Sequence, residues 1–216
     1  MFVYRIIIRY LYGIIIMIAV ITGDIINSKQ GKVDEWLVPL KNALLRYGQS
    51  PIDWEIFRGD SFQLALKPAQ AFGAATHIKS VIKISKQHDV RLAIGIGEVT
   101  HHSSQITEAN GTAYSHSGEA FALLKKQALA IKTSNNEWDK GMNLMFKLAL
   151  LAADHWSPVV ANVIRTALEN NEKSQQELAQ MLGRSQSVIS ATLSRGGYDE
   201  IMELNQYYQQ QISVVC

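Results

Sequence analysis

The stretch "WEIFRGDSFQLAL" (residues 54–66) decides how the first half of this chain folds. Two apolar runs flank the short polar and glycine segment Arg-Gly-Asp-Ser, a pattern that predicts a β-hairpin with Asp60 at its tip. A second aspartate, Asp24, ends a buried-looking run in "IAVITGDIINS" (residues 18–28). If that strand lies beside the hairpin, the two carboxylates converge at one edge of a sheet.

Outward from the hairpin, short apolar runs alternate with amphipathic stretches as far as about residue 132. This alternation is typical of an α+β or α/β domain, and we expect α+β. The expected strands are residues 18–22, 54–57, 62–67 and 91–99, and the expected helices lie within residues 33–48, 69–87 and 118–131.

The pattern becomes helical after residues 134–141. Helices are expected at residues 142–156 and 158–170 and in a pair at 174–195, with a last strand signal in "ISVVC". We therefore expect a sheet domain over residues 17–137 and an all-α domain over residues 138–216.

Composition limits the class of protein. A chain of 216 residues that is 47% hydrophobic can bury one good core and carry a small second module. Its net charge of +2 does not by itself indicate a polyanionic partner. The single cysteine, Cys216, excludes an internal disulfide and a cysteine-rich metal site. A cytoplasmic location fits this usage.

Residues 1–16 are apolar, but Arg5 and Arg9 interrupt them. The uncharged run over residues 10–23 is shorter than the roughly 20 residues that span a bilayer. We expect Met17 to be the natural start, with residues 1–16 as non-native upstream sequence. An extra N-terminal strand and a weak membrane anchor are the alternatives.

Asp24 and Asp60 have two interpretations. In the first, Asp24 caps the next segment and Asp60 is an ordinary turn residue. In the second, they form an oxygen cluster for Mg²⁺, which usually takes one or two carboxylates together with phosphates of a ligand. The candidate nucleotide-binding residues then lie around the two aspartates: Gly23, Ile25, Asn27, Ser28, Arg58, Gly59 and Ser61. Histidines 101, 102 and 116 lie in polar stretches and match no zinc spacing.

Three segments, "IAVITGDI", "FRGDSFQLAL" and "VRLAIGIGEV", occur in an order and spacing that resemble class III nucleotidyl cyclases and the palm of GGDEF-type diguanylate cyclases. Together with the helical C-terminal third, the chain from Met17 resembles the bacterial SatD family. The resemblance implies a ferredoxin-like, cyclase-type palm in which Asp24 and Asp60 are metal ligands.

The chain departs from the cyclase pattern at the residues that orient ribose and stabilise the transferring phosphate. Ser115 and Glu119 stand there, and a glutamate repels a polyphosphate. Ile56 replaces a polar purine-selecting residue, and Ser61 replaces the acidic fourth residue of the GGDEF motif. We therefore expect nucleotide binding without ordinary cyclase activity, and an active cyclase or nucleotidyltransferase is the alternative.

The segment "SQQELAQMLGRSQSVISATLSR" (residues 174–195) resembles the helix-turn-helix of phage-repressor and sigma-like proteins. Ser174 and Glu177 form a capping box, and Gly183 permits a tight turn. The residues expected inside are Leu178, Ala179, Leu182, Val188, Ile189 and Leu193, and the candidate DNA-binding residues are Arg184, Ser185, Gln186, Ser187, Ser190 and Arg195.

The alternative is a helix pair that serves dimerisation or packing, and the slightly acidic balance of residues 157–203 supports it. Our leading hypothesis is a cytoplasmic, homodimeric transcriptional regulator. In it, a catalytically degenerate palm senses a nucleotide with Mg²⁺ and the helix-turn-helix binds double-stranded DNA.

Overall fold

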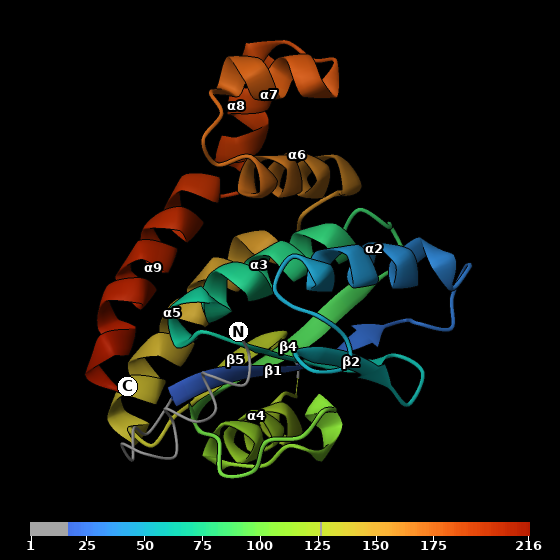
Figure 1. Cartoon of the computed structure of the whole chain (residues 1–216). Coiled ribbons are helices and arrows are strands. Elements are labelled where there is room, and N and C mark those ends of the chain that lie inside the picture. Colours follow the sequence, from blue (N-terminus) through green and yellow to red (C-terminus); the bar gives the residue numbers. More distant parts are fainter. Residues whose placement is uncertain (1–16, 126) are drawn as a thin grey trace.

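The computed structural model describes residues 17–125 and 127–216 (Figure 1). The expectations for residues 1–16 lie outside this part of the chain. No helix within the described residues is long and apolar enough to cross a membrane.

The centre of the molecule is one mixed sheet of five strands in the order β2-β3-β1-β4-β5. Its strands are β1 (Met17–Ile26), β2 (Trp54–Phe57), β3 (Ser61–Leu66), β4 (Asp89–Glu98) and β5 (Leu129–Lys132). Neighbouring strands from β2 to β4 run antiparallel, whereas β5 runs parallel to β4. The predicted α+β class is confirmed, and so is the hairpin of residues 54–66.

Helices cover both faces of the sheet (Figure 1). One face carries α2 (Asp34–Leu45), α3 (Ala71–Ile82) and α5 (Asn136–Ala153), and the other carries α4 (Thr112–Leu123). Because it lies between two helical layers, β4 is buried on both faces from Leu92 to Gly97. By contrast, β3 alternates between half-buried and buried residues, as a one-sided strand does.

Two glycines on β4 let α4 approach the sheet closely. A Cβ atom added at Gly95 would meet the backbone of Ala113 and Ser117, and one added at Gly97 would meet Thr112 and Ala113. The helix backbone therefore occupies the space in which side chains would stand on an ordinary strand.

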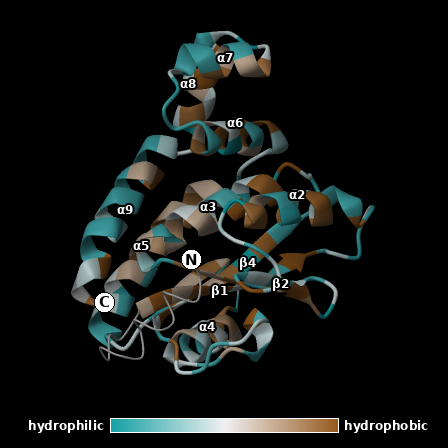
Figure 2. Cartoon of the chain, in the orientation of Figure 1, coloured by the Kyte–Doolittle hydropathy of each residue, from teal (hydrophilic) through white to brown (hydrophobic). Residues whose placement is uncertain are grey.

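The C-terminal half is helical and continues with α6 (Pro158–Glu169), α7 (Gln175–Leu182), α8 (Gln186–Arg195) and α9 (Tyr198–Gln211). The strands, α3 and α5 carry most of the hydrophobic colour in Figure 2, whereas α9 is largely hydrophilic. The described residues also include the 3₁₀ turns Pro68–Gln70, Ile106–Glu108 and Ile212–Val214.

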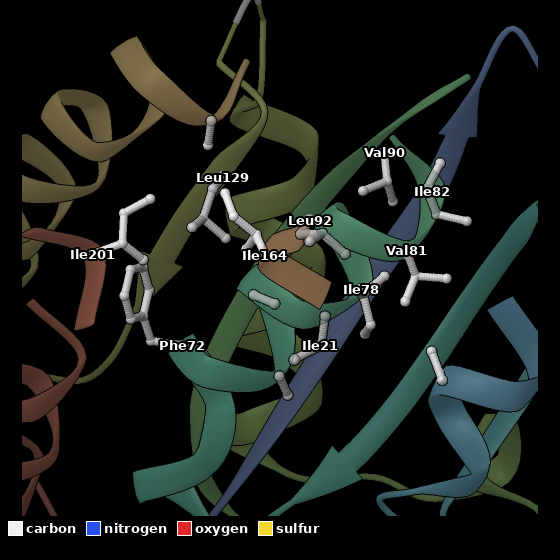
Figure 3. Close-up of a cluster of buried hydrophobic side chains, with 14 of the residues drawn as sticks. Ile21, Phe72, Ile78, Val81, Ile82, Val90, Leu92, Leu129, Ile164 and Ile201 are labelled. Atoms are coloured by element: carbon white, nitrogen blue, oxygen red, sulfur yellow. The ribbon is translucent and has the colours of Figure 1, made fainter. Parts of the chain in front are cut away.

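The main hydrophobic core extends from the sheet into the C-terminal helices (Figure 3). It joins Ile21 and Leu92 of the sheet to Phe72 of α3, Ile164 of α6 and Ile201 of α9. Tyr208 of α9 is fully buried beside Phe72 and Phe146, and its hydroxyl donates to the Pro68 carbonyl at 2.8 Å. The division into domains at residue 137 stays a prediction.

Two predicted elements were wrong. The helix expected over residues 118–131 ends at Leu123, and Leu129–Lys132 forms β5, because the open edge of β4 offers a pairing partner to a short apolar run. The strand expected in "ISVVC" is a 3₁₀ turn that continues α9 and places Ile212 in the core.

Candidate functional site

Asp24 lies on β1, and Asp60 lies in the hairpin tip just before the neighbouring strand β3, at one end of the sheet. Asp24 on β1 lies opposite Ser61 on β3, one residue after Asp60. The amide of Ile25 donates to the carbonyl of Asp60 at 3.2 Å, so the hairpin tip is attached directly to the strand that carries Asp24. The expected adjacency of strand and hairpin is confirmed.

Asp24 is engaged by an arginine from the other side of β1. Arg91 of β4 lies opposite Asp24 in the register, so both side chains project from the same face. The Arg91 Nε donates to Asp24 Oδ1 at 2.9 Å, and Nη2 donates to Oδ2. The guanidinium also lies over the Phe121 ring of α4, 5.5 Å from its centroid.

The hydrogen bonds that Arg91 donates to Asp24 raise the pKa of Arg91 against the opposing effect of burial, and the charges of Asp24 and Asp60 add to the rise. The arginine is thus permanently charged and lies in the field of both carboxylates. The side chain of Arg91 remains 37% exposed, which leaves part of the guanidinium accessible to a ligand from solvent.

Asp60 has a partner of its own. The hydroxyl of Ser28 donates to Asp60 Oδ2, and the indole of Trp36 on α2 donates to the Ser28 carbonyl at 3.2 Å. Asn27 has a positive φ of 61°, and its amide group donates to the Gln87 carbonyl at 3.0 Å. The first bond attaches the turn after β1 to the hairpin tip, and the other two attach that turn to α2 and to the segment before β4.

The remaining candidate nucleotide-binding residues divide by face. Arg58 and Gly59 are exposed and form the tip of the hairpin, where both have positive φ. Gly23 lies on the opposite, core-facing side, because an added Cβ atom would meet Phe62 and Leu92. Ile25 is also on the core side, 3% exposed, so it offers a ligand only its backbone.

The oxygen donors suit Mg²⁺ in kind, but their present partners compete with a metal ion. Both oxygens of Asp24 bind Arg91, and Asp60 accepts from Ser28. Within residues 17–125 and 127–216, no group of three or more His, Cys, Asp or Glu side chains is placed to hold a metal. Coordination by Asp24 and Asp60 therefore requires that Arg91 release Asp24 and that phosphate supply further oxygens.

The helix pair at residues 174–195 has defined ends. The Ser174 hydroxyl accepts from the Glu177 amide at 3.3 Å, and the Glu177 carboxylate accepts from the Ser174 amide at 2.8 Å. This reciprocal pair completes the expected capping box, and its bonds lower the pKa of Glu177. Gly183 ends α7 with φ 60° and ψ 41°, and Ser185 caps α8.

The buried and exposed faces of this pair follow the expected pattern with one exception. Leu178, Ala179, Ile189 and Leu193 are buried and Leu182 is half-buried against the core, whereas Val188 is 46% exposed and its predicted burial was wrong. Val188 lies in the first turn of α8. Arg184, Ser185, Gln186, Ser187, Ser190 and Arg195 are all exposed.

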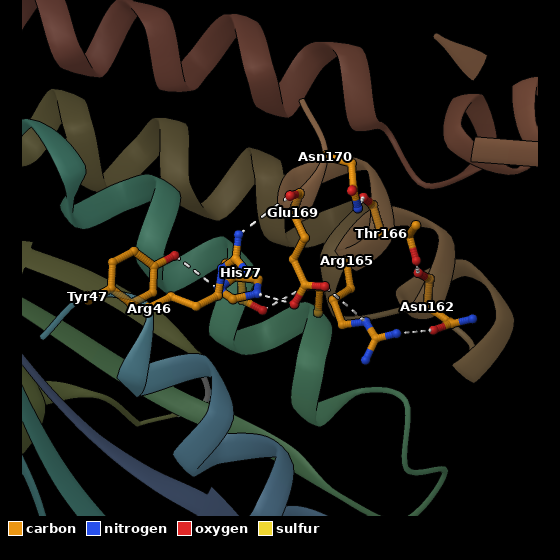
Figure 4. Close-up of polar contacts among 9 residues, drawn as sticks. Arg46, Tyr47, His77, Asn162, Arg165, Thr166, Glu169 and Asn170 are labelled. Atoms are coloured by element: carbon orange, nitrogen blue, oxygen red, sulfur yellow. Dashed lines mark hydrogen bonds and ion pairs between the residues drawn. The ribbon is translucent and has the colours of Figure 1, made fainter. Parts of the chain in front are cut away.

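A buried polar cluster that the sequence did not predict joins α2, α3 and α6 (Figure 4). His77 of α3 is 3% exposed; its Nδ1 lies 3.0 Å from the Tyr47 hydroxyl, and its Nε2 lies 3.0 Å from Glu169 Oε1. Burial lowers the pKa of His77, although Glu169 opposes the effect. Burial also raises the pKa of Tyr47 to about 12.

These shifts define the protons in the cluster. A neutral His77 donates from Nε2 to Glu169, and the protonated Tyr47 donates to Nδ1. The Glu169 contact is therefore a hydrogen bond at neutral pH rather than an ion pair. It connects the helices over the sheet to α6, on which α8 packs.

Sequence reasoning also missed the role of Arg91. The residue stands in the quoted segment "VRLAIGIGEV", and its position at the start of a buried strand was a usable signal. Its partner depends on the register of β4 against β1, which a single sequence does not define.

The family comparison covers nearly the whole described chain. The SatD family model matches residues 17–212, from the first residue of β1 into the last 3₁₀ turn. No match was found among curated proteins or among solved structures. A match over this length, across both the sheet and the C-terminal helices, means that the chain belongs to the SatD family.

Proposed function

We propose that this chain is a DNA-binding transcriptional regulator that reads double-stranded DNA with α8. The observation that carries the proposal is the α7–α8 pair, in which a capping box and a left-handed glycine fix the turn. The N-terminal half of α8 is left exposed beyond that turn. In helix-turn-helix proteins this part of the second helix contacts base edges in the major groove.

The exposed residues have the right chemistry for this task. Gln186 can pair with an adenine edge, Ser187 and Ser190 can bind bases or phosphates, and Arg184 and Arg195 can bind phosphates. The surrounding helices are slightly acidic, so a single copy binds DNA weakly. A homodimer doubles the arginines at the DNA surface and matches a palindromic operator.

The test selects duplexes from a random pool with the full chain and then measures affinity by fluorescence anisotropy. Gln186→Ala should weaken binding to the selected duplex about tenfold and relax the base preference at one position. Gln206→Ala, an exposed glutamine on α9, is the matched control and should leave binding unchanged. Failure to enrich any sequence, or equal effects of the two variants, would refute the proposal.

The sheet domain supports a second part of the proposal, a nucleotide sensor. The element order β1-α2-β2-β3-α3-β4 with antiparallel neighbours β2-β3-β1-β4 is the order of a ferredoxin-like palm. Asp24 lies opposite Ser61, the residue after Asp60, and Arg91 lies opposite Asp24 with its guanidinium over Phe121 of α4, which supports this part of the proposal. We propose that a nucleotide binds here with Mg²⁺ on the two aspartates.

In this arrangement the phosphate takes Arg91 while the metal takes Asp24. When Arg91 turns away, Asp24 loses its positively charged partner, and the metal ion takes that place. The guanidinium of Arg91 exchanges the carboxylate of Asp24 for a phosphate. Binding thereby rearranges the contact between β1, β4 and α4. Glu119 is 59% exposed and lies near Lys132, which fits a palm without the transition-state clamp of a cyclase.

Calorimetry with ATP, GTP and cyclic nucleotides, with and without Mg²⁺, tests the sensor. Asp60→Ala should abolish metal-dependent binding, whereas Asp199→Ala, an exposed aspartate on α9, should not change it. Product in the mixture that is lost in Asp24→Ala would identify an active cyclase or nucleotidyltransferase instead. Equal binding by Asp60→Ala and the wild type would refute the site.

A further inference from the structure

The exposed side of α5 carries a ridge of leucines that the described residues, 17–125 and 127–216, leave largely uncovered. Leu144, Leu148 and Leu151 are 59%, 59% and 70% exposed. They follow each other at spacings of four and three residues, which places them along one line of the helix. Isolated exposed leucines are common, but a continuous ridge of this kind marks an interaction surface.

A groove of about 540 Å³ runs beside the ridge, between α5 and α9. Its α5 wall consists of Met145, Leu148, Ala149, Leu151 and Ala152, and its α9 wall consists of Glu200, Ile201 and Leu204. Ala149 and Ala152 leave room for the groove, and Leu148 and Leu151 of the ridge form its outer edge. The same surface patch thus contains a protruding apolar ridge and an apolar groove.

Charges flank the two features on opposite sides. Lys147 lies on the side of α5 away from α9, and Glu200 and Glu203 lie on the exposed side of α9. Within the part of the chain that the structure describes, none of these three side chains forms an ion pair. Across the patch the order is therefore lysine, leucine ridge, apolar groove and glutamates.

This order is self-complementary about a two-fold axis that runs along α5. Rotation about such an axis places the ridge of one copy over the groove of the other and Lys147 over the glutamates of the partner. A two-fold axis perpendicular to α5 would instead oppose ridge to ridge and lysine to lysine. We propose that the α5–α9 surface is the homodimer interface of this chain, with a second copy as its occupant.

The proposed recognition of a palindromic DNA site depends on this dimer. α8 ends at Arg195, and Ser194 and Gly197 belong to the groove wall. Because the axis runs along α5, both copies carry their α7–α8 pairs at the same end of the assembly. Two α8 helices then face one side of a duplex, as a palindromic operator requires.

Sedimentation equilibrium of the full chain, without DNA, tests the interface. The wild type should be a dimer, and Leu148→Glu should raise the dimer dissociation constant at least about tenfold, because a carboxylate is then buried without a partner. Leu123→Glu is the matched control, since Leu123 is 73% exposed on α4, on the opposite face of the sheet. It should leave the dissociation constant unchanged.

A charge exchange tests the two-fold geometry. Lys147→Glu alone and Glu200→Lys/Glu203→Lys alone should each weaken self-association, whereas the two variants mixed should form a heterodimer. A monomeric wild type, undiminished association of Leu148→Glu, or no heterodimer on mixing would each overturn the proposal.

The outcomes separate the interface from the DNA-binding proposal. A monomer that still selects a duplex overturns the interface alone. A dimer that selects no duplex overturns DNA binding and leaves the interface in place.

Discussion

Asp24 and Arg91 lie directly opposite each other on neighbouring antiparallel strands, and the guanidinium of Arg91 binds both oxygens of the Asp24 carboxylate. The pair places a permanent cation beside two carboxylates at the end of the sheet where a phosphate ligand is proposed. Without a ligand, the positive charge of Arg91 neutralises the Asp24 carboxylate, as a bound metal ion would do. The pair thus links β1 to β4 at the position of the proposed ligand.

Asp24→Asn should lower the free energy of unfolding by about 1 to 2 kcal/mol. The side chains of Asp24 and Arg91 are 18% and 37% exposed, so the pair lies between a surface and a buried ion pair. Urea unfolding measures the change, and Arg58→Gln at the exposed hairpin tip should change it by less than about 0.5 kcal/mol. In a double-mutant cycle with Arg91→Gln, additive losses would show that the pair contributes no coupling.

His77 should make the stability of the protein depend on pH. In the unfolded chain its pKa is near 6.5, and burial lowers it in the folded protein. Below pH 6.5 the unfolded chain takes up a proton before the folded protein does. The contribution of neutral His77 to the free energy of unfolding is therefore complete above pH 6.5. It declines as the pH falls towards the pKa of His77 in the folded protein.

Unfolding curves between about pH 5 and pH 8 measure this dependence. His77→Gln should remove the His77 component of the slope, because glutamine does not titrate. His155→Gln, at an exposed histidine, should leave the slope unchanged. The same slope in wild type and His77→Gln would contradict a neutral, buried His77.

The parts of the fold that the sequence predicts are those with local signals. Alternating apolar residues around a glycine predict the hairpin tip at Arg58 to Asp60. The capping box at the start of the preceding helix, together with Gly183 at its end, predicts the turn between α7 and α8. β5 has no such signal, because "LAIK" is four residues of ambiguous pattern and becomes a strand only beside β4.

The site shows the same limit. Two aspartates could be predicted to meet because each ends a recognisable strand or turn. The partner of Asp24 could not be predicted, because a shift of one residue in register would turn Arg91 to the other face. His77 was missed for a related reason: Tyr47 and Glu169 lie 30 and 92 residues away in sequence.

Gly95→Ala should displace α4 from the sheet. The added Cβ atom would meet backbone atoms of Ala113 and Ser117, which cannot move like the end of a flexible side chain. We expect a loss of about 2 kcal/mol or more in the free energy of unfolding. Amide hydrogen exchange should be faster in α4 than in the wild type.

Gly118→Ala is the control within the same helix. Nothing lies within 4 Å of a Cβ atom at Gly118, so alanine should raise stability by a few tenths to about 1 kcal/mol. If Gly95→Ala leaves α4 protected, the close contact between β4 and α4 is not required for packing.

Gly183→Ala should destabilise the turn between α7 and α8 for a purely conformational reason. Gly183 has φ 60°, and nothing lies within 4 Å of an added Cβ atom, so the cost of about 1 kcal/mol is that of a left-handed non-glycine residue. Gly141→Ala, at an equally open position inside α5, should instead stabilise the protein, because alanine favours a helix. Urea unfolding of the two variants should therefore shift in opposite directions. If the urea midpoints of both variants shift in the same direction, the left-handed conformation of Gly183 does not determine the stability of the turn before α8.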